Sequence, residues 1–122
     1  MILDHIGYNV RDFAISKAFY VQALAPLGIV VLAQGDGWAM VGRDGKPQFW
    51  FGQLGAPQTG LHLAFAATDR EQVRGFHAAA LAAGGKDNGA PGVRPHYHAN
   101  YYGAFVFDPD GNNIEAVCHL PE

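Results

Sequence analysis

The amino-acid sequence predicts an α+β fold in which one β-α-β-β-β unit is used twice in tandem. A repeat emerges when the chain is aligned with itself at a shift of 57 residues, the separation of His5 and His62. Each copy begins with a segment of alternating apolar and polar residues and continues with a segment of helical periodicity. Each copy then ends in short apolar runs separated by tight-turn residues.

The repeat matches chemically distinctive residues and not only alanines. Without a gap, the shift pairs His5 with His62, Asp12 with Asp69, Phe19 with Phe76 and Gly28 with Gly85. The length of 122 residues is that of one domain. We therefore expect a single domain over residues 1–122, with module one over about residues 1–57 and module two over about residues 58–122.

The first strand of each module is predicted over residues 2–10 and 61–67. Because side chains alternate between the two faces of a strand, Tyr8 is assigned to the face that packs on the helix and His5 to the opposite face. The same alternation assigns His62 to the face away from the helix. The small residues Gly7 and Ala64 follow the two histidines at a distance of two positions, which leaves room for a bound group.

A helix is predicted after the first strand of each module. Asp12 can cap the first helix, and Thr68 followed by Glu71 is a capping-box start for the second. Gly28 and Gly85 are expected to end the two helices as C′ glycines. The predicted inward stripes are Ile15, Phe19 and Ala23 on the first helix and Val73, Phe76 and Ala80 on the second.

Strand-like runs follow both helices. The predicted runs are residues 28–34, 37–43 and 46–53 in module one, and residues 100–107 and 112–120 in module two. The turn Asp108-Pro109-Asp110-Gly111 joins the last two runs. Module two is longer by nine residues, which we assign to a Gly/Pro-rich loop over residues 86–99 that holds only a weak strand candidate near residues 86–90.

Composition excludes several functional classes. The net charge of −3 provides no basic surface for nucleic acid and no polybasic patch for a membrane. The single cysteine, Cys118, favours a reducing, cytoplasmic setting, and the first ten residues are predicted as strand and not as a secretory leader. Hydrophobic residues at 49% and charged residues at 16% are typical of an ordinary soluble globular protein.

Glu115 lies in the middle of an otherwise apolar strand and therefore needs a partner. A buried carboxylate is normally paired with a cation or bound to a metal. Two imidazoles at equivalent positions of a repeat, His5 and His62, together with Glu115 favour a site for Zn, Fe, Mn, Ni or Co with open coordination positions. The alternatives are an ion pair of Glu115 with Arg43 or Arg94, and histidines that are hydrogen-bonded structural residues.

The sequence resembles the vicinal oxygen chelate superfamily, which includes glyoxalases, extradiol dioxygenases, fosfomycin-modifying transferases and bleomycin-resistance proteins. The resemblance rests on LDHIGYNVRDFAISKAFY, LHLAFAA and FVFDPDGNNIEAV and covers nearly the whole chain. It implies that the two modules form a cupped mixed sheet with a divalent metal on its concave face.

The resemblance also implies a ligand set. The family's metal ligands correspond here to His5, His62 and Glu115, whereas the fourth position of glyoxalase I carries Phe49, which cannot bind a metal. The tyrosine that many dioxygenase and fosfomycin-type members place ten residues before the glutamate is replaced by Phe105. Tyr101 or Tyr102 can take its role only if the strand bends.

Further residues are candidates for contact with a substrate. We expect His98 and Tyr101 to contact substrate or to move protons together with Glu115, the alternative being a surface loop with stray histidines. His96 shares a face with His98 but lacks a third ligand for a second metal site. Trp50, Phe49, Asn9 and Phe105 are the candidate substrate-binding residues, although aromatic residues in strands are more often core. His77 is expected to face solvent, and Cys118 to be a buried structural residue.

Two functions follow from these features. The first is a metal-dependent enzyme of lyase, isomerase or dioxygenase type that chelates the oxygens of a small-molecule substrate. The second is a metal-free protein that sequesters a small molecule, as bleomycin-resistance relatives do. By resemblance we expect a homodimer, in which the site forms either within one chain or from modules of two chains.

Overall fold

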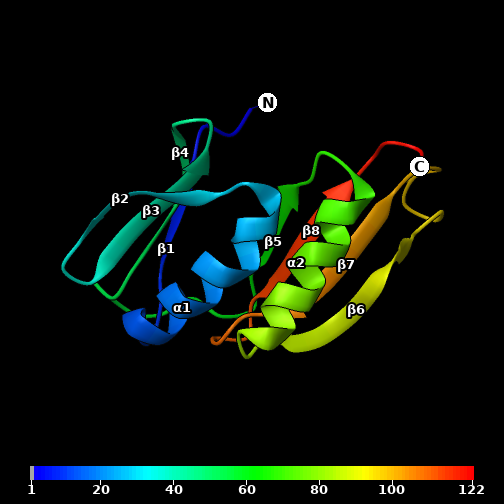
Figure 1. Cartoon of the computed structure of the whole chain (residues 1–122). Helices are drawn as coiled ribbons and strands as arrows, with labels where there is room; N and C mark the ends of the chain where they lie inside the picture. Colours follow the sequence, from blue (N-terminus) through cyan, green and yellow to red (C-terminus); the bar gives the residue numbers. More distant parts are fainter. Residues whose placement is uncertain (1) are drawn as a thin grey trace.

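The computed structural model describes residues 2–122, which form two four-stranded sheets and two α-helices (Figure 1). The elements of module one are β1 (Ile6–Asn9), α1 (Phe13–Leu24), the short 3₁₀ helix η1 (Ala25–Leu27), β2 (Val30–Gly35), β3 (Trp38–Arg43) and β4 (Lys46–Gly52). Those of module two are β5 (His62–Ala66), α2 (Arg70–Ala82), β6 (Lys86–Val93), β7 (Tyr102–Phe107) and β8 (Asn113–Cys118). The predicted β-α-β-β-β unit is therefore confirmed in both halves.

The two sheets have the same topology. Their strand orders are β1-β4-β3-β2 and β5-β8-β7-β6. In each sheet the first strand of the module runs parallel to the last strand, and the other pairs are antiparallel. Within residues 2–122, β1 pairs only with β4 and β5 only with β8, so each of these two strands leaves one edge unpaired.

The helices join the two modules through a shared core. In Figure 1, α1 and α2 lie beside each other, and α2 covers β7 and β8. The buried side chains of both modules form one cluster. Its largest fully buried members are Tyr20, Phe19, Phe49, Phe51, Phe76, Leu24, Leu27 and Ile114.

The strand boundaries differ from the prediction at two places. β1 begins at Ile6, so His5 lies just before the strand and not within it. β6 extends over Lys86–Val93, so much of the predicted loop over residues 86–99 is strand. The pairing of β6 with β7 shifts register on both sides of Gly89. Such bulges accommodate an extra residue without ending the ladder.

The helix signals were correct in kind but displaced by one residue in module two. Asp12 caps α1 by accepting a hydrogen bond from the Ile15 amide at 3.2 Å, as predicted. The N-cap of α2 is Asp69 and not Thr68, because the Asp69 carboxylate accepts from the Gln72 amide at 2.8 Å. The Gln72 side chain in turn accepts from the Thr68 amide at 2.9 Å, so Asp69 and Gln72, and not the predicted Thr68 and Glu71, hold the start of the helix.

The predicted buried faces of the helices are largely confirmed. Val73, Phe76 and Ala80 of α2 are fully buried. On α1, however, Ile15 is 56% exposed, and Ser16 is buried beside Phe19 instead. After α2 it is Gly84, and not Gly85, that adopts the left-handed conformation, with φ of 98°.

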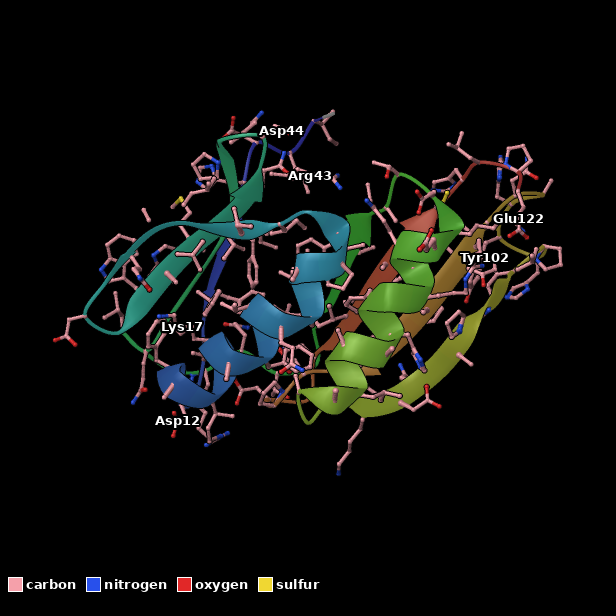
Figure 2. The ribbon with its side chains drawn as sticks, viewed as in Figure 1. Asp12, Lys17, Arg43, Asp44, Tyr102 and Glu122 are labelled. Atoms are coloured by element: carbon pink, nitrogen blue, oxygen red, sulfur yellow. The ribbon has the colours of Figure 1, made fainter. Side chains whose placement is uncertain are left out.

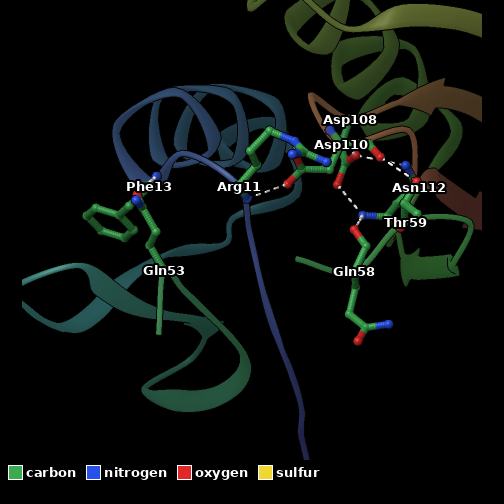
Figure 3. A network of polar contacts seen from close by, with 8 residues as sticks. All are labelled: Arg11, Phe13, Gln53, Gln58, Thr59, Asp108, Asp110 and Asn112. Carbon is green, nitrogen blue, oxygen red and sulfur yellow. Dashed lines mark hydrogen bonds and ion pairs between the residues drawn. The ribbon is translucent and has the colours of Figure 1, made fainter. Parts of the chain in front are cut away.

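A polar network at the start of β8 connects the two modules, and Figure 3 shows the part of it around Asp108, Asp110 and Asn112. Asp108 in the turn accepts hydrogen bonds from the amides of Asp110 and Asn112 at 2.9 and 2.8 Å. Its second oxygen accepts from the hydroxyl of Tyr20 in α1 at 2.5 Å, and the Tyr20 oxygen lies 2.7 Å from that of Tyr8 in β1. This buried chain of polar groups links β1 and α1 of module one to the last hairpin of module two.

Further contacts extend this junction to the connection between the modules. The Arg11 amide donates to the Asp110 carboxylate at 3.1 Å, and the Thr59 hydroxyl donates to the Asp110 carbonyl at 2.7 Å. The amide of Phe13, at the start of α1, donates to the side chain of Gln53 at 2.8 Å. The turn therefore positions β8, which carries Glu115.

Candidate functional site

Glu115 lies at the centre of β8 on the face of the module-two sheet that points away from α2. It pairs with Ala64 of β5 on one side and with Phe105 of β7 on the other. Its side chain is only 1% exposed. The next residue of β7 on the same face as Phe105 is Gly103, and a Cβ there would lie 3.1 Å from Oε2 of Glu115. The missing side chain at Gly103 thus leaves room for the carboxylate.

Two side chains contact the carboxylate of Glu115. Nε2 of His62, at the start of β5, lies 2.8 Å from Oε1. The hydroxyl of Tyr101 donates a hydrogen bond to Oε2. The His62 side chain is 55% exposed, so the pair opens to solvent on the imidazole side. Two of the predicted site residues, His62 and Tyr101, therefore meet at Glu115.

Neither arginine considered as a partner contacts this carboxylate. Arg43 donates to the carbonyls of Leu27 and Ala66 at 2.8 and 3.2 Å. Arg94 donates to the Ala90 carbonyl at 2.8 Å, and its guanidinium lies over the ring of Phe105. The alternative of an Arg–Glu115 ion pair is therefore wrong.

Tyr101 reaches Glu115 from the residue just before β7. The Tyr101 amide donates to the His98 carbonyl at 3.1 Å, and the Arg94 amide donates to the Tyr101 carbonyl at 2.6 Å. These bonds close the segment over residues 94–101 and turn the Tyr101 ring back over the sheet. Burial, and then the hydrogen bond to Glu115, raise the pKa of the Tyr101 hydroxyl well above its ordinary value, so the group remains a proton donor at neutral pH.

Aromatic rings surround Tyr101. The rings of Tyr97 and His119 stand edge-on to it, with centroids at 5.1 and 5.2 Å. The ring centroids of His98 and His119 are 5.5 Å apart. Nδ1 of His98 accepts a hydrogen bond from the Asn100 amide at 3.2 Å. His98 therefore stands next to Tyr101 and not against Glu115. No sequence signal assigned His119 to this group; it lies four residues after Glu115, just beyond the end of β8.

His5 lies elsewhere in the chain. Its Nδ1 contacts the Asp4 carboxylate at 2.8 Å, and the side chain is exposed. His5 lines a cavity of about 530 Å³ between the modules, together with residues 63–66 of β5 and the β3–β4 turn, but without His62 or Glu115. Within residues 2–122, no three His, Cys, Asp or Glu side chains lie close enough to share a metal ion. One chain thus brings together two of the three predicted ligands.

The four candidate substrate-binding residues occupy different environments. Phe105 faces the ring of His62, with centroids 6.3 Å apart, and so lies beside Glu115. Phe49 is 1% exposed and packs in the core against Tyr8 and Tyr20. Trp50 points to the opposite face of β4 and covers Gly7. Asn9 accepts a hydrogen bond from the Leu54 amide and helps to hold the connection between the modules.

The remaining candidates, His77, His96 and Cys118, have three different surroundings. His77 does not face solvent as expected: its Nε2 lies 3.0 Å from the Asp87 carboxylate, and its side chain is 13% exposed. The ring of His96 packs against that of Tyr97, with centroids 4.2 Å apart. Cys118 is a free, buried thiol, as predicted. No helix within residues 2–122 is long and apolar enough to cross a bilayer.

Comparisons with known proteins agree with this architecture. The sequence profile of the Glyoxalase/Bleomycin resistance protein/Dioxygenase superfamily matches residues 2–116. A crystal structure of a glyoxalase/bleomycin resistance protein from Albidiferax ferrireducens T118 is similar to this chain at 31% identity and a TM-score of 0.83, covering 98% of this chain and 100% of that one. No match was found among curated proteins.

Two further crystal structures share the fold at lower identity. A glyoxalase/bleomycin resistance protein/dioxygenase family enzyme from Burkholderia phytofirmans PsJN is 21% identical, with a TM-score of 0.72 and coverage of 96% of this chain and 98% of that one. A glyoxalase-related enzyme from Fulvimarina pelagi is 19% identical, with a TM-score of 0.72 and coverage of 97% and 87%. At such identities the likeness concerns the fold alone.

Proposed function

Because this chain belongs to the glyoxalase/bleomycin resistance protein/dioxygenase superfamily, we propose that it is an enzyme that holds a divalent metal ion and acts on a small molecule through that molecule's oxygen atoms. The reaction is of the isomerase, lyase or ring-cleaving dioxygenase type. The observation that carries the proposal is the position of Glu115, a buried carboxylate in contact with an imidazole and a phenol.

The donors around Glu115 fit a divalent metal. A buried carboxylate needs positive charge close by, because its transfer out of water costs several kcal/mol. Its partners here are His62, which is partly open to solvent, and Tyr101, which is neutral at ordinary pH. An imidazole and a carboxylate on adjacent strands are ligands that Zn, Fe, Mn, Ni or Co accept. His62 and Glu115 would hold the ion, and Tyr101 would orient the carboxylate.

A second copy of the chain is the proposed source of the third ligand, His5. The unpaired edges of β1 and β5 are suited to pair with another copy, because an exposed strand edge offers free amide and carbonyl groups. The exposed apolar side chains of Ile2 and Leu3 precede β1 and would be buried by such pairing. In this homodimer, His5 of one copy would complete the site formed by His62 and Glu115 of the other.

The chain's own groups support chemistry at this site. A bound divalent ion would supply Lewis-acid stabilisation of an oxyanion or, in the case of iron, activation of dioxygen. Glu115 can accept a proton when its contact with Tyr101 loosens, and Tyr101 remains a donor because its pKa is raised. Phe105 and the rings of Tyr97 and His119 line one side of the site and suit a planar or apolar substrate.

Metal content of the purified protein tests the proposal. We expect about one ion per chain by elemental analysis of the wild type, and loss of most of it in Glu115→Gln, His62→Ala and His5→Ala. His96→Ala is the matched control, because that exposed imidazole lies outside the Glu115 cluster and its loss should leave the metal content unchanged. Undiminished metal in Glu115→Gln and His62→Ala would rule out the assignment.

Metal-free sequestration of a small molecule is the second candidate function. It is favoured by the finding that, within residues 2–122 of one chain, only two of the three predicted ligands come together. Calorimetric titration of the apoprotein with divalent ions distinguishes the two functions. Absence of metal binding, combined with tight binding of a planar compound to the apoprotein, would favour sequestration.

A further inference from the structure

Two arginines of α2 form a second polar cluster, on the face of the module-two sheet opposite to Glu115. Arg70 and Arg74 are one helical turn apart, and their guanidinium groups lie over the ring of Tyr102 at 4.8 and 5.8 Å from its centroid. Arg74 also donates a hydrogen bond to the Tyr102 hydroxyl at 3.3 Å. Tyr102 pairs with Cys118, whose side chain points away from the Glu115 face. The cluster is therefore separate from the site proposed above.

A carboxylate of the same chain already lies between the two guanidinium groups. Oε2 of Glu122 is 3.7 Å from one terminal nitrogen of Arg70, and Oε1 is 3.8 Å from one of Arg74. Figure 2 labels Tyr102 and Glu122 near each other beside the start of α2. These distances are those of ion pairs and exceed hydrogen-bond length. The Glu122 side chain is 69% exposed, so it is held loosely.

The Nε–H of Arg70 lacks a hydrogen-bond partner although it is buried. Among residues 2–122 it is the only buried side-chain nitrogen or oxygen without one. A buried donor without an acceptor costs about 1 to 3 kcal/mol, and such groups are rare in folded proteins. The planar guanidinium presents Nε–H and a terminal N–H as a fork that matches the two oxygens of a carboxylate. Arg70 is therefore arranged for an acceptor that Glu122 contacts only in part.

The surroundings select the charge and size of that acceptor. A cavity of about 270 Å³ adjoins the arginines, and Leu120 and Pro121 form its apolar wall. The carboxylates of Asp69 and Glu71 also line it, and Asp69 is engaged as the helix cap. Besides Glu122, the cavity is therefore lined by two cationic and two anionic side chains. A ligand with one negative charge that replaces the Glu122 carboxylate leaves the local charge unchanged, whereas a dianion adds a negative charge.

We propose that Arg70, Arg74 and Tyr102 form a binding site for the carboxylate of a small monocarboxylic acid, which exchanges with the side chain of Glu122. Glu122 acts as an internal ligand that occupies the site weakly. The entering carboxylate accepts from the Nε–H of Arg70 and pairs with Arg74. This site does not depend on the proposed metal centre, because it lies on the other face of the sheet.

NMR of the arginine Nε–H groups tests this site, with acetate as the probe. Sodium acetate is titrated into the full chain and into Glu122→Gln, with sodium chloride at the same ionic strength as the control. We expect the Arg70 Nε–H signal to shift saturably with acetate. The apparent affinity should be about fivefold or more higher in Glu122→Gln, because the tethered carboxylate no longer competes. The Nε–H signals of Arg11 and Arg43 serve as internal references.

A conservative variant, Arg70→Lys, separates loss of the binding site from loss of the fold. Arg70→Lys retains the positive charge but loses the fork, so acetate should no longer produce a saturable shift of the Arg74 signal. Acetate shifts that match those of chloride would overturn the proposal. An apparent affinity that is equal in the wild type and in Glu122→Gln would also overturn it, since Glu122 would then not occupy the site.

Discussion

The hydroxyl of Tyr101 donates a hydrogen bond to Oε2 of Glu115, while Oε1 of the same carboxylate faces Nε2 of His62. The two donors come from the residue before β7 and from the start of β5, on either side of β8. Glu115 is thus held from both neighbouring strands at the centre of the sheet. Orientation of a carboxylate from two sides is what a metal ligand or a general base requires.

Replacement of Tyr101 by Phe tests the importance of this contact. We expect Tyr101→Phe to lower the free energy of unfolding by about 1 to 2 kcal/mol, because a buried carboxylate loses a hydrogen-bond donor. Denaturation with urea measures this loss, and elemental analysis should also detect weaker metal retention. Tyr97→Phe is the matched control, since Tyr97 is 62% exposed and its ring packs against those of Tyr101 and His96. Equal stability of the two variants would contradict the structural role of Tyr101.

Tyr20→Phe tests the junction between the modules. The Tyr20 side chain is fully buried and joins Asp108 of module two to Tyr8 of module one. Its removal leaves the Tyr8 hydroxyl without that partner and removes a donor from a buried carboxylate, so we expect a loss of about 2 to 3 kcal/mol in the free energy of unfolding. Tyr8→Phe, which keeps the Tyr20–Asp108 bond, should cost less. The prediction fails if the order of the two losses is reversed.

Alkaline pH should weaken the fold through the same two tyrosines. Burial raises the pKa of Tyr8 and Tyr20 well above the ordinary value of about 10. Because each pKa is higher in the folded than in the unfolded state, the stabilisation is complete below pH of about 10 and is lost as pH rises further.

Unfolding by urea between neutral pH and the alkaline limit measures this dependence. The free energy of unfolding should fall with pH above about 10, by up to about 1.4 kcal/mol per pH unit for each group. Tyr20→Phe should show a shallower fall than the wild type, because it lacks one of the groups whose pKa is raised in the folded state. Parallel curves for the two proteins would show that other groups control the alkaline transition.

Much of the fold was predictable because the repeat constrains it. The alignment of His5 with His62 and of Asp12 with Asp69 indicated two equivalent modules, and alternation in the first strands assigned the helix-packed faces correctly. β6 was assigned mainly to a loop because Gly89, Pro91 and Gly92 depress strand propensity. In the structure, register shifts around Gly89 accommodate these residues in the ladder with β7.

Only the part of the candidate site that depends on the strands themselves, His62 and Glu115, was predictable. Alternation placed His62 on the face away from the helix, the family resemblance implied that Glu115 joins it, and the pairing of β5 with β8 brings them together. The contact of Tyr101 depends on how the segment over residues 94–101 folds back, which has no signal in the strand pattern. The separation of His5 from Glu115 depends on how the modules pack, because helix contacts and the Tyr20–Asp108 bond fix their relation.

Because His5 and Glu115 of one chain lie apart, the proposed dimeric site can be tested by mixing two variants that each lack one metal ligand. One variant, His5→Ala, keeps an intact Glu115, and the other, Glu115→Gln, keeps an intact His5. If His5 of one copy completes the site of the other, each mixed dimer contains one site with all three ligands and one site that lacks two. Neither variant alone forms a complete site.

Unfolding and refolding of an equimolar mixture allows the chains to exchange. Random pairing then makes about half of the dimers mixed, so about one quarter of all sites should regain metal, as measured by elemental analysis after dialysis. A mixture of His62→Ala with Glu115→Gln is the control. These two substitutions affect the same module, so every mixed site lacks one ligand and no metal returns. If the His5→Ala and Glu115→Gln mixture also stays empty while the refolded wild type binds metal, His5 does not act across the dimer, because complementation requires only that intact residues of two chains meet.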